Sequence, residues 1–345
     1  MGGGGVGLLV LRMTATGGAC GRDVKRLMMG VVRRIAAVNA AATLEGALLA
    51  DVLFWGRPDV PADHKRAFAL ALAGASLGCA HSKGVLGCCY AYGRGVAEDR
   101  LKGLELGRES VAAGSCMGQY VVGKCYAAGW GVVQDNAEAA RHWRLAAAQG
   151  QGHARAQYNL GLMFANGQGV AQDYAEAVRL YRLAAAQGHS GAQNNLGNMF
   201  SDGRGVAQDY AEAVRLCRLA AAQGNADAQS NLGNMFYFGR GVAQDYAEAV
   251  RLCCLAAAQG NAMAQNNLGH MFETGQGVAQ DYAEAVRLYR LAAAQGHAMA
   301  QSNLGFMLEY GQGVAQDQSE AIQWYRLSAA QGQAYATAAL ERLGA

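Results

Sequence analysis

The chain has 345 residues and a formal net charge of +3, and charged side chains make up 16% of it. That charged fraction lies below the roughly 25% of typical soluble proteins, and the small net charge gives no support for a nucleic-acid partner. No run of 18 apolar residues occurs, so we expect no transmembrane segment.

The first 43 residues precede the regular part of the sequence. Residues 1–21 are rich in glycine and lack hydrophobic periodicity, so we expect a disordered leader. Residues 22–43 place apolar side chains at helical spacing from Val24 to Val38, with basic residues on the opposite face. This pattern predicts an amphipathic helix that caps the first repeat. The alternative is a basic targeting or membrane-surface helix.

From about residue 44 the sequence repeats itself. A 36-residue string from Val206 to Gly241 returns with few changes from Val170, Val242 and Val278. One aspartate marks each copy, and these residues are Asp63, Asp99, Asp135, Asp173, Asp209, Asp245, Asp281 and Asp317. Their spacing is 36 residues except for one step of 38, where a Gln-Gly pair is doubled at residues 149–152. We therefore expect eight units over 44–333, the first one degenerate, and a capping half-unit over 334–345.

Each unit contains the start and stop signals of two helices. Asp173 and Glu176 have the spacing of a capping box at the start of one helix, and Gly188 follows its end. Another helix is expected from Ala192 to about Ser201. We call the helix that begins after the marker aspartate the first helix of a unit, and the helix after it the second helix.

The buried face of the first helix is predicted from its apolar spacing. Ala177, Leu180, Tyr181 and Ala184 form one stripe, while Glu176 and Arg179 form an exposed pair. Neither helix can bury its stripe alone, so the units must stack. The sequence therefore predicts an all-α fold, a right-handed α/α superhelix of about eight 36-residue, two-helix repeats.

The repeated string also resembles a known family. Its pattern, A-Q-x-N-L-G-x-M-F-x-x-G-x-G-V-x-x-D-Y-x-x-A, is similar to the Sel1-like repeat, a relative of the tetratricopeptide repeat, over residues 44–345. The resemblance implies an adaptor that assembles membrane or signalling complexes, as in endoplasmic-reticulum protein degradation. A cysteine-rich bacterial branch pairs cysteines within each repeat. This chain has Ala186 and Ala222 at the first of those places, so that branch's enzyme-like activities do not carry over.

Comparison of the copies separates constant from variable positions in the second helix. The variable ones are Gly191, Asn194, Asn198, Ser201 and Asp202 and their equivalents. Their offsets of 0, 3, 7, 10 and 11 residues place them on one helix face. Tetratricopeptide repeats line their concave groove at these places, so the resemblance and the periodicity agree.

This face is the predicted partner-binding site. Aromatic residues on a solvated face indicate an interaction surface, although neutral drift is the alternative explanation. We expect a groove that holds a partner segment by apolar anchors and mildly prefers basic segments. The predicted partner-binding residues are Arg155, Asn194, Asn198, Asp227, Asn234, Tyr237, Phe238, Met263, His270, Glu273, Met299, Phe306, Glu309 and Tyr310.

Four asparagines of the second helices are invariant: Asn195, Asn231, Asn267 and Asn303. We expect this ladder to bond to the backbone of an adjacent helix or loop, and contact with a bound peptide backbone is the alternative.

Catalytic and metal sites find no support in the sequence. Cys79 and Cys88 are nine residues apart, on opposite sides of a helix, while Cys217 and Cys253 take the buried Tyr181 position of their units. No spacing fits a zinc site, so we expect reduced thiols and no metal or cofactor. The histidines scatter or recur with the repeat, and no catalytic grouping such as Ser-His-Asp occurs.

These observations favour a non-enzymatic scaffold or adaptor that binds protein or peptide segments. The alternatives are an enzyme in which the repeats only present substrate, with its chemistry in residues 1–58, and a purely structural array. We expect no nucleic-acid partner and no small-molecule substrate. A cytoplasmic location follows from the reduced cysteines, with targeting to an organelle through the basic amino-terminal helix as the alternative.

Overall fold

The computed structural model describes residues 44–56, 59–149 and 153–345. These residues form seventeen helices and no strand. They belong to two compact units, of which unit 1 ends at Gln187 and unit 2 begins at Gly188. The predicted leader (1–21) and the predicted amino-terminal helix (22–43) lie outside the described residues.

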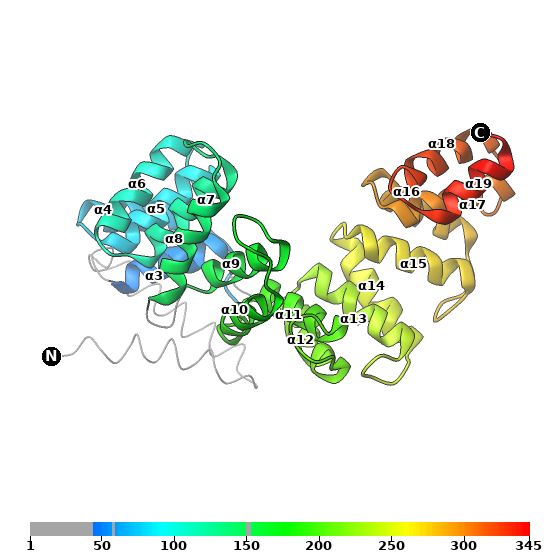
Figure 1. The fold of residues 1–345 in the computed structure, drawn as a ribbon, viewed down its shortest axis with the longest axis horizontal. Helices are drawn as coiled ribbons and strands as arrows, with labels where there is room; N and C mark the ends of the chain where they lie inside the picture. Colours follow the sequence, from blue (N-terminus) through cyan, green and yellow to red (C-terminus); the bar gives the residue numbers. More distant parts are fainter. Residues whose placement is uncertain (1–43, 57–58, 150–152) are drawn as a thin grey trace. The chain divides into compact units, whose positions relative to one another are not determined.

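The described part of unit 1 contains eight helices (Figure 1). They are α3 (Leu44–Trp55), α4 (His64–Ser76), α5 (Ala80–Tyr92), α6 (Arg100–Ala112), α7 (Cys116–Ala128), α8 (Asn136–Ala148), α9 (Ala154–Asn166) and α10 (Tyr174–Ala186). Each helix packs against the next one in the chain. The even-numbered helices are the first helices of their 36-residue repeats, and the odd-numbered ones are the second helices.

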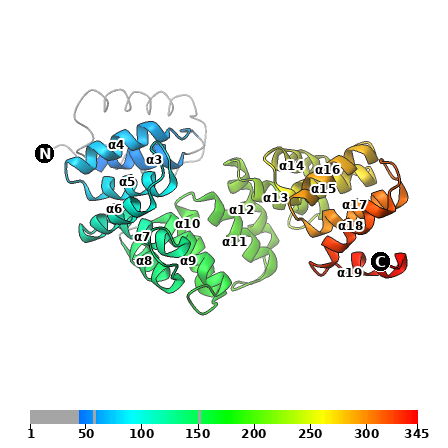
Figure 2. The same cartoon turned by 90° about the horizontal axis from the view of Figure 1, so that it is seen from above.

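Unit 2 continues the same alternation with nine helices (Figures 1 and 2). They are α11 (Ser190–Asp202), α12 (Tyr210–Ala222), α13 (Ala226–Phe238), α14 (Tyr246–Ala258), α15 (Ala262–Thr274), α16 (Tyr282–Ala294), α17 (Ala298–Tyr310), α18 (Gln318–Ala329) and α19 (Ala334–Leu343). Consecutive helices pack together throughout this unit as well. The predicted all-α solenoid of about eight two-helix repeats is confirmed.

The core of each repeat is the predicted stripe of the first helix. In α10, Ala177, Leu180, Tyr181 and Ala184 are all buried. The equivalent tyrosine of α16, Tyr289, lies against Gly269 of α15, where a Cβ atom would come within 2.8 Å of the ring. Small residues in the second helix therefore let the large core residue of the following first helix approach closely.

Each first helix begins at its marker aspartate, although the predicted capping box is only half formed. Asp173 accepts a hydrogen bond from the backbone N–H of Glu176 at 3.0 Å, which satisfies one of the free amide groups of the first turn. The carboxylate of Glu176 does not reach back to the cap, because it binds Nε and Nη2 of Arg179, each at 2.7 Å. The amide of Asp173 instead donates to the carbonyl of Phe164 at 2.9 Å.

The turn that joins a second helix to the next first helix has the sequence Gly-x-Gly, and two features of its geometry require glycine. Gly239 and Gly241 both have positive φ angles, +66° and +72°, a region that favours glycine. A Cβ atom on Gly241 would also collide with the carbonyl oxygen of Tyr210, at the start of α12 in the same repeat. The turn therefore serves as a packing surface for the previous first helix.

Candidate functional site

The structure places the fourteen predicted residues on five second helices. Arg155 lies on α9 in unit 1, and the other thirteen lie on α11, α13, α15 and α17 in unit 2. Asn194 and Glu309 are buried, and the half-buried ones are Arg155, Asn198, Asn234, Tyr237, Glu273 and Phe306. The exposed ones are Asp227, Phe238, Met263, His270, Met299 and Tyr310. The predicted set therefore contains side chains of very different accessibility.

The three asparagines of this set accept hydrogen bonds from the invariant asparagines of the next second helix. Asn231 donates to the side-chain oxygens of Asn194 and Asn198, both at 3.0 Å. Asn267 donates to Asn234 at 2.9 Å, and Asn303 donates to Asn266 at 3.1 Å in the same way. These three members of the invariant ladder therefore bond to side chains of the preceding second helix, whereas the sequence favoured backbone partners. Their bonds fix the register between neighbouring repeats.

The two glutamates of the predicted surface are bonded within the repeat array. Glu273 accepts from the hydroxyl of Tyr289 at 2.6 Å and lies 3.8 Å from Nδ1 of His270. Hydrogen bonding, chiefly from His270, lowers the pKa of Glu273, because it favours the charged form.

Glu309 is held still more tightly in the last full repeat. Its carboxylate accepts from both terminal nitrogens of Arg342 on α19 and from the hydroxyl of Tyr325 at 2.9 Å. The hydrogen bonds from Arg342 come first among the interactions that lower the pKa of Glu309. Both carboxylates thus serve as acceptors for a buried tyrosine of the following first helix.

An exposed apolar surface lies at the carboxyl-terminal end of unit 2. We define the unit 2 apolar surface as Met263, Met299, Phe306, Tyr310 and Tyr335. The side chains of Met263, Met299, Tyr310 and Tyr335 are 42%, 48%, 51% and 51% exposed. The ring of Phe306 lies 4.7 Å from that of Tyr310 and 6.3 Å from that of Tyr335, between centroids.

Tyr335 belongs to this surface but is absent from the residues that the sequence predicts. It is the second residue of α19, the position that Met263 and Met299 hold in α15 and α17. The signal is the repeat register, because the variable face continues into the terminal half-unit. Tyr237 and Phe238 form a neighbouring pair on α13, with ring centroids 4.8 Å apart, and the hydroxyl of Tyr237 donates to Gln276.

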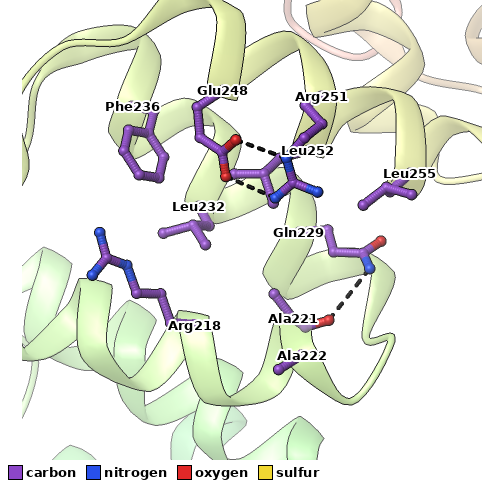
Figure 3. Close-up of a pocket in the computed structure, with 10 residues that line it drawn as sticks. All are labelled: Arg218, Ala221, Ala222, Gln229, Leu232, Phe236, Glu248, Arg251, Leu252 and Leu255. Carbon is purple, nitrogen blue, oxygen red and sulfur yellow. Dashed lines mark hydrogen bonds and ion pairs between the residues drawn. The ribbon is translucent and has the colours of Figure 1, made fainter.

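A pocket opens on the other side of α13 (Figure 3). Its volume is about 380 Å³, and Leu232, Phe236 and Leu252 form part of its apolar lining. Glu248 binds Arg251 at the rim, at 2.7 Å. Asp227, Asn234 and Tyr237 lie on the opposite face of α13 by helical spacing, and no predicted residue lines this pocket.

The histidines that recur at the inter-helix turns have a structural role that the sequence analysis missed. His153, His189 and His297 each accept, through Nδ1, a hydrogen bond from the backbone N–H three residues later, at 3.2–3.3 Å. Asn225 and Asn261 do the same through their side-chain oxygens. The exchange of histidine for asparagine at one repeat position is the sequence signal, since both can cap a helix.

The remaining chemistry of the described residues is limited. The eight cysteines of residues 44–345 are free thiols, and burial raises the pKa of Cys217 and Cys253 to about 12. In the same part of the chain, no three His, Cys, Asp or Glu side chains gather as a metal site. None of the described helices combines the length and the apolar content that crossing a membrane requires.

Comparison with known proteins identifies the repeat. The family model described as Sel1 repeat matches eight segments, which are residues 47–79, 85–115, 116–151, 154–189, 190–225, 226–261, 262–297 and 298–333. Most of these segments start at a second helix, whereas the units defined above start at a first helix. Both divisions describe the same array. No curated protein matches the chain.

Two solved structures are similar over most of this chain. One is a protective antigen of uropathogenic Escherichia coli strains that displays an SLR fold, with 33% identity over 90% of this chain and a TM-score of 0.63. The chain covers 66% of that protein, just under two thirds of its length. The other is a Sel1 repeat protein from Oxalobacter formigenes, with 27% identity, a TM-score of 0.65, and coverage of 71% of this chain and 96% of that one.

Proposed function

We propose that this chain, which belongs to the Sel1 repeat family, is a non-enzymatic scaffold that binds a segment of a partner protein on the second helices of unit 2. The observation that carries the proposal is the unit 2 apolar surface. Four of its five side chains are about half exposed, and Phe306 lies against both Tyr310 and Tyr335. Exposed apolar patches are typical of interaction sites. Tyrosine and methionine also suit such surfaces, because they add large contact area.

Charge adds a weaker preference to this proposal. Glu273 keeps one face of the surface negative, since its pKa is lowered, and Asp227 is exposed on α13. Arg342 already neutralises Glu309. We therefore propose a partner segment that contributes apolar anchors, with basic residues giving only a mild advantage. The cytoplasmic location stays a prediction.

Removal of two aromatic anchors tests this function. In the variant Tyr310→Ala with Tyr335→Ala, a partner that wild type captures in stoichiometric amount should bind at least tenfold more weakly, because central aromatic anchors carry much of the binding energy. The control is Leu219→Ala with Leu291→Ala, which removes apolar side chains of similar exposure, 44% and 43%, from first helices. Affinity capture with mass spectrometry, followed by titration of the captured protein, measures the change.

Three outcomes would contradict the proposal. Equal binding by the tyrosine variant would place the partner elsewhere. Equal loss in the leucine variant would show that the effect is not specific to this surface. The absence of any stoichiometric partner would favour a purely structural array. Helicity measured by circular dichroism must be unchanged in both variants for the comparison to apply.

A further inference from the structure

Unit 1 carries a row of aromatic rings with no counterpart among the predicted binding residues. Phe54 and Trp55 end α3, Tyr92 ends α5, and Trp130 lies in the turn after α7. We call these four side chains the aromatic row. Neighbouring ring centroids are 4.7 Å apart for Phe54 and Trp55, 5.6 Å for Trp55 and Tyr92, and 5.0 Å for Tyr92 and Trp130, with interplanar angles of 81–87°.

Basic side chains cover the faces of these rings. The guanidinium carbon of Arg155 lies 3.9 Å from the centroid of Trp55. That of Arg94 lies 5.3–5.7 Å from the centroids of Phe54, Trp55 and Tyr92. Trp130 has Lys124 at 5.5 Å and Arg100 at 5.2 Å. Each contact is within the range of a cation–π interaction, which holds the cation in place without neutralising it.

Most of these cations have no carboxylate to balance them. Arg100 pairs with Glu98 at 2.8 Å, but no carboxylate of the described residues lies within 4.0 Å of Arg94, Lys124 or Arg155. Several arginines of the first helices differ in this respect, because each pairs with a glutamate of its own helix, as Arg179 pairs with Glu176. Three of the four cations at the aromatic row therefore have no described carboxylate in direct contact, although Asp51 is close enough to act on the same His153 side chain as Arg155.

Two buried polar atoms at the row are also left without a hydrogen-bond partner. Among the residues that the structure describes, the indole N–H of Trp55 has no acceptor, and one carboxylate oxygen of Asp51 has no donor. Asp51 precedes Trp55 by four residues on α3, so both lie on the same face of that helix. Buried polar atoms are rarely left unbonded. Because protein atoms cover both groups, they mark the inner side of the row and are not contact points for a ligand.

We propose that this face of unit 1 docks an acidic segment of a partner protein. Glutamate or aspartate side chains would bind the outward N–H groups of Arg94 and Arg155, which stacking on the rings leaves free. This interface is separate from the unit 2 apolar surface and does not depend on the function proposed there.

Nucleic acid fits the same charges less well. Single-stranded nucleic acids gain affinity by stacking bases on free aromatic faces. Here the rings meet edge to face, and cations already cover Trp55 and Trp130. A protein segment with carboxylates is therefore the occupant that this surface favours.

Direct binding of short probes tests the proposal on the full chain. The probes are fluorescein-labelled ten-residue peptides, one with glutamate at six positions among glycines and one with glutamine at those positions, together with a ten-nucleotide oligo(dT). Fluorescence anisotropy at 50 and 300 mM salt should give at least tenfold tighter binding for the glutamate peptide than for either other probe. Its affinity should fall as salt rises.

Charge-removing substitutions identify the residues. Arg94→Gln with Arg155→Gln should weaken binding of the glutamate peptide at least tenfold, whereas Arg94→Lys with Arg155→Lys should retain most of it. The matched control is Arg218→Gln with Arg240→Gln in unit 2, where the two guanidinium carbons lie 5.7 and 5.0 Å from the rings of Phe236 and Phe238. That control should bind within twofold of wild type. If the double substitution reduces helicity, Lys124→Gln serves as a second charge-removing variant, because Lys124 lies on Trp130 and not on Trp55.

Four results would overturn the proposal. The first is no binding of the glutamate peptide at millimolar concentration, and the second is wild-type binding of it by both the Arg94/Arg155 glutamine variant and the Lys124 variant. The third is a loss of affinity in the unit 2 control as large as that in the Arg94/Arg155 glutamine variant, and the fourth is tighter binding of oligo(dT) than of the glutamate peptide. The last result would assign the face to single-stranded nucleic acid.

Discussion

At the scale of single residues, the caps of the second helices explain why histidine recurs in this chain. The acceptor is Nδ1 in His153, His189 and His297 and a side-chain oxygen in Asn225 and Asn261. A histidine can fill this role only while Nδ1 carries no proton. Burial lowers the pKa of His153 to about 4, which keeps the cap formed at neutral pH.

The pH dependence of stability should therefore contain a contribution from His153. The unfolded chain takes up a proton near the ordinary pKa of 6.5, whereas the folded chain resists protonation down to about pH 4. The free energy of unfolding should be highest above pH 6.5 and should fall as the pH decreases from 6.5 to 4; between pH 7 and pH 5 this group should contribute a loss of about 2 kcal/mol. Urea unfolding of wild type at pH 7 and pH 5 measures the change.

The variant His153→Asn supplies the comparison, because two repeats already use asparagine as the cap. It should reduce the loss of stability between pH 7 and pH 5. Asn225→Ala, which removes a cap that has no ionisable group, should lower stability but leave its pH dependence nearly unchanged. An unaltered pH profile in the His153 variant would show that this residue does not titrate as proposed.

At the scale of helices, the glutamines near the ends of the first helices connect neighbouring repeats. Gln265 of α15 is buried. It accepts from the side chain of Gln295, just after α16, at 2.8 Å and donates to the carbonyl of Ala257 in α14 at 3.4 Å. It thus joins three helices through one side chain. The same contact recurs between Gln331 and Gln301 at 2.9 Å.

Loss of the hydrogen bond between Gln295 and Gln265 should lower the free energy of unfolding. Gln295→Ala leaves the buried oxygen of Gln265 without its donor, so the free energy of unfolding should fall by about 1 kcal/mol. A double-mutant cycle with Gln265→Ala should give a coupling energy of about 0.5–1.5 kcal/mol. Gln323→Ala, on an exposed residue of α18, is the control and should change stability by less than about 0.5 kcal/mol. A coupling energy near zero would contradict the role given to Gln265.

At the scale of the whole molecule, the repeats share one backbone plan but do not have interchangeable cores. Where the core residue is Tyr289 or Tyr325, the preceding second helix supplies Glu273 or Glu309 as acceptor for its hydroxyl. Where the core residue is Cys217 or Cys253, Ser201 or Tyr237 holds the corresponding position. In these repeats of unit 2, a tyrosine at the core position is thus matched to a glutamate of the preceding second helix, whereas a cysteine is not.

Deletion of one complete 36-residue unit should reveal this matching. Removal of residues 206–241 brings Cys253 next to Ser201, a combination equivalent to the native pair of Cys217 and Ser201. Removal of residues 242–277 leaves Tyr289 facing Tyr237, so its buried hydroxyl loses Glu273. Both shortened chains should be helical by circular dichroism, but the second should be less stable by about 1–3 kcal/mol. Equal urea midpoints for the two would show that the cores are interchangeable.

The sequence alone determined the repeat, the two helices of each unit and the stripe of α10 that is buried. These features follow from local spacing, from aspartate caps and from glycine punctuation, all of which can be read within one 36-residue window. The helix bounds therefore agree with the expectation to within a few residues. The same comparison of copies also separated the stacking positions from a variable face.

Only the tertiary structure decided which residues of that variable face are exposed and which are bonded within the fold. Asn194 and Glu309 belong to the same variable face as Met299 and Tyr310. The first two are bonded to Asn231 and Arg342, whereas the last two are about half exposed. Their partners lie 33–37 residues away or on the terminal half-repeat, so spacing within one helix carries no information about them. Contacts between repeats, and not the repeat itself, determine whether a variable position stabilises the fold or faces solvent.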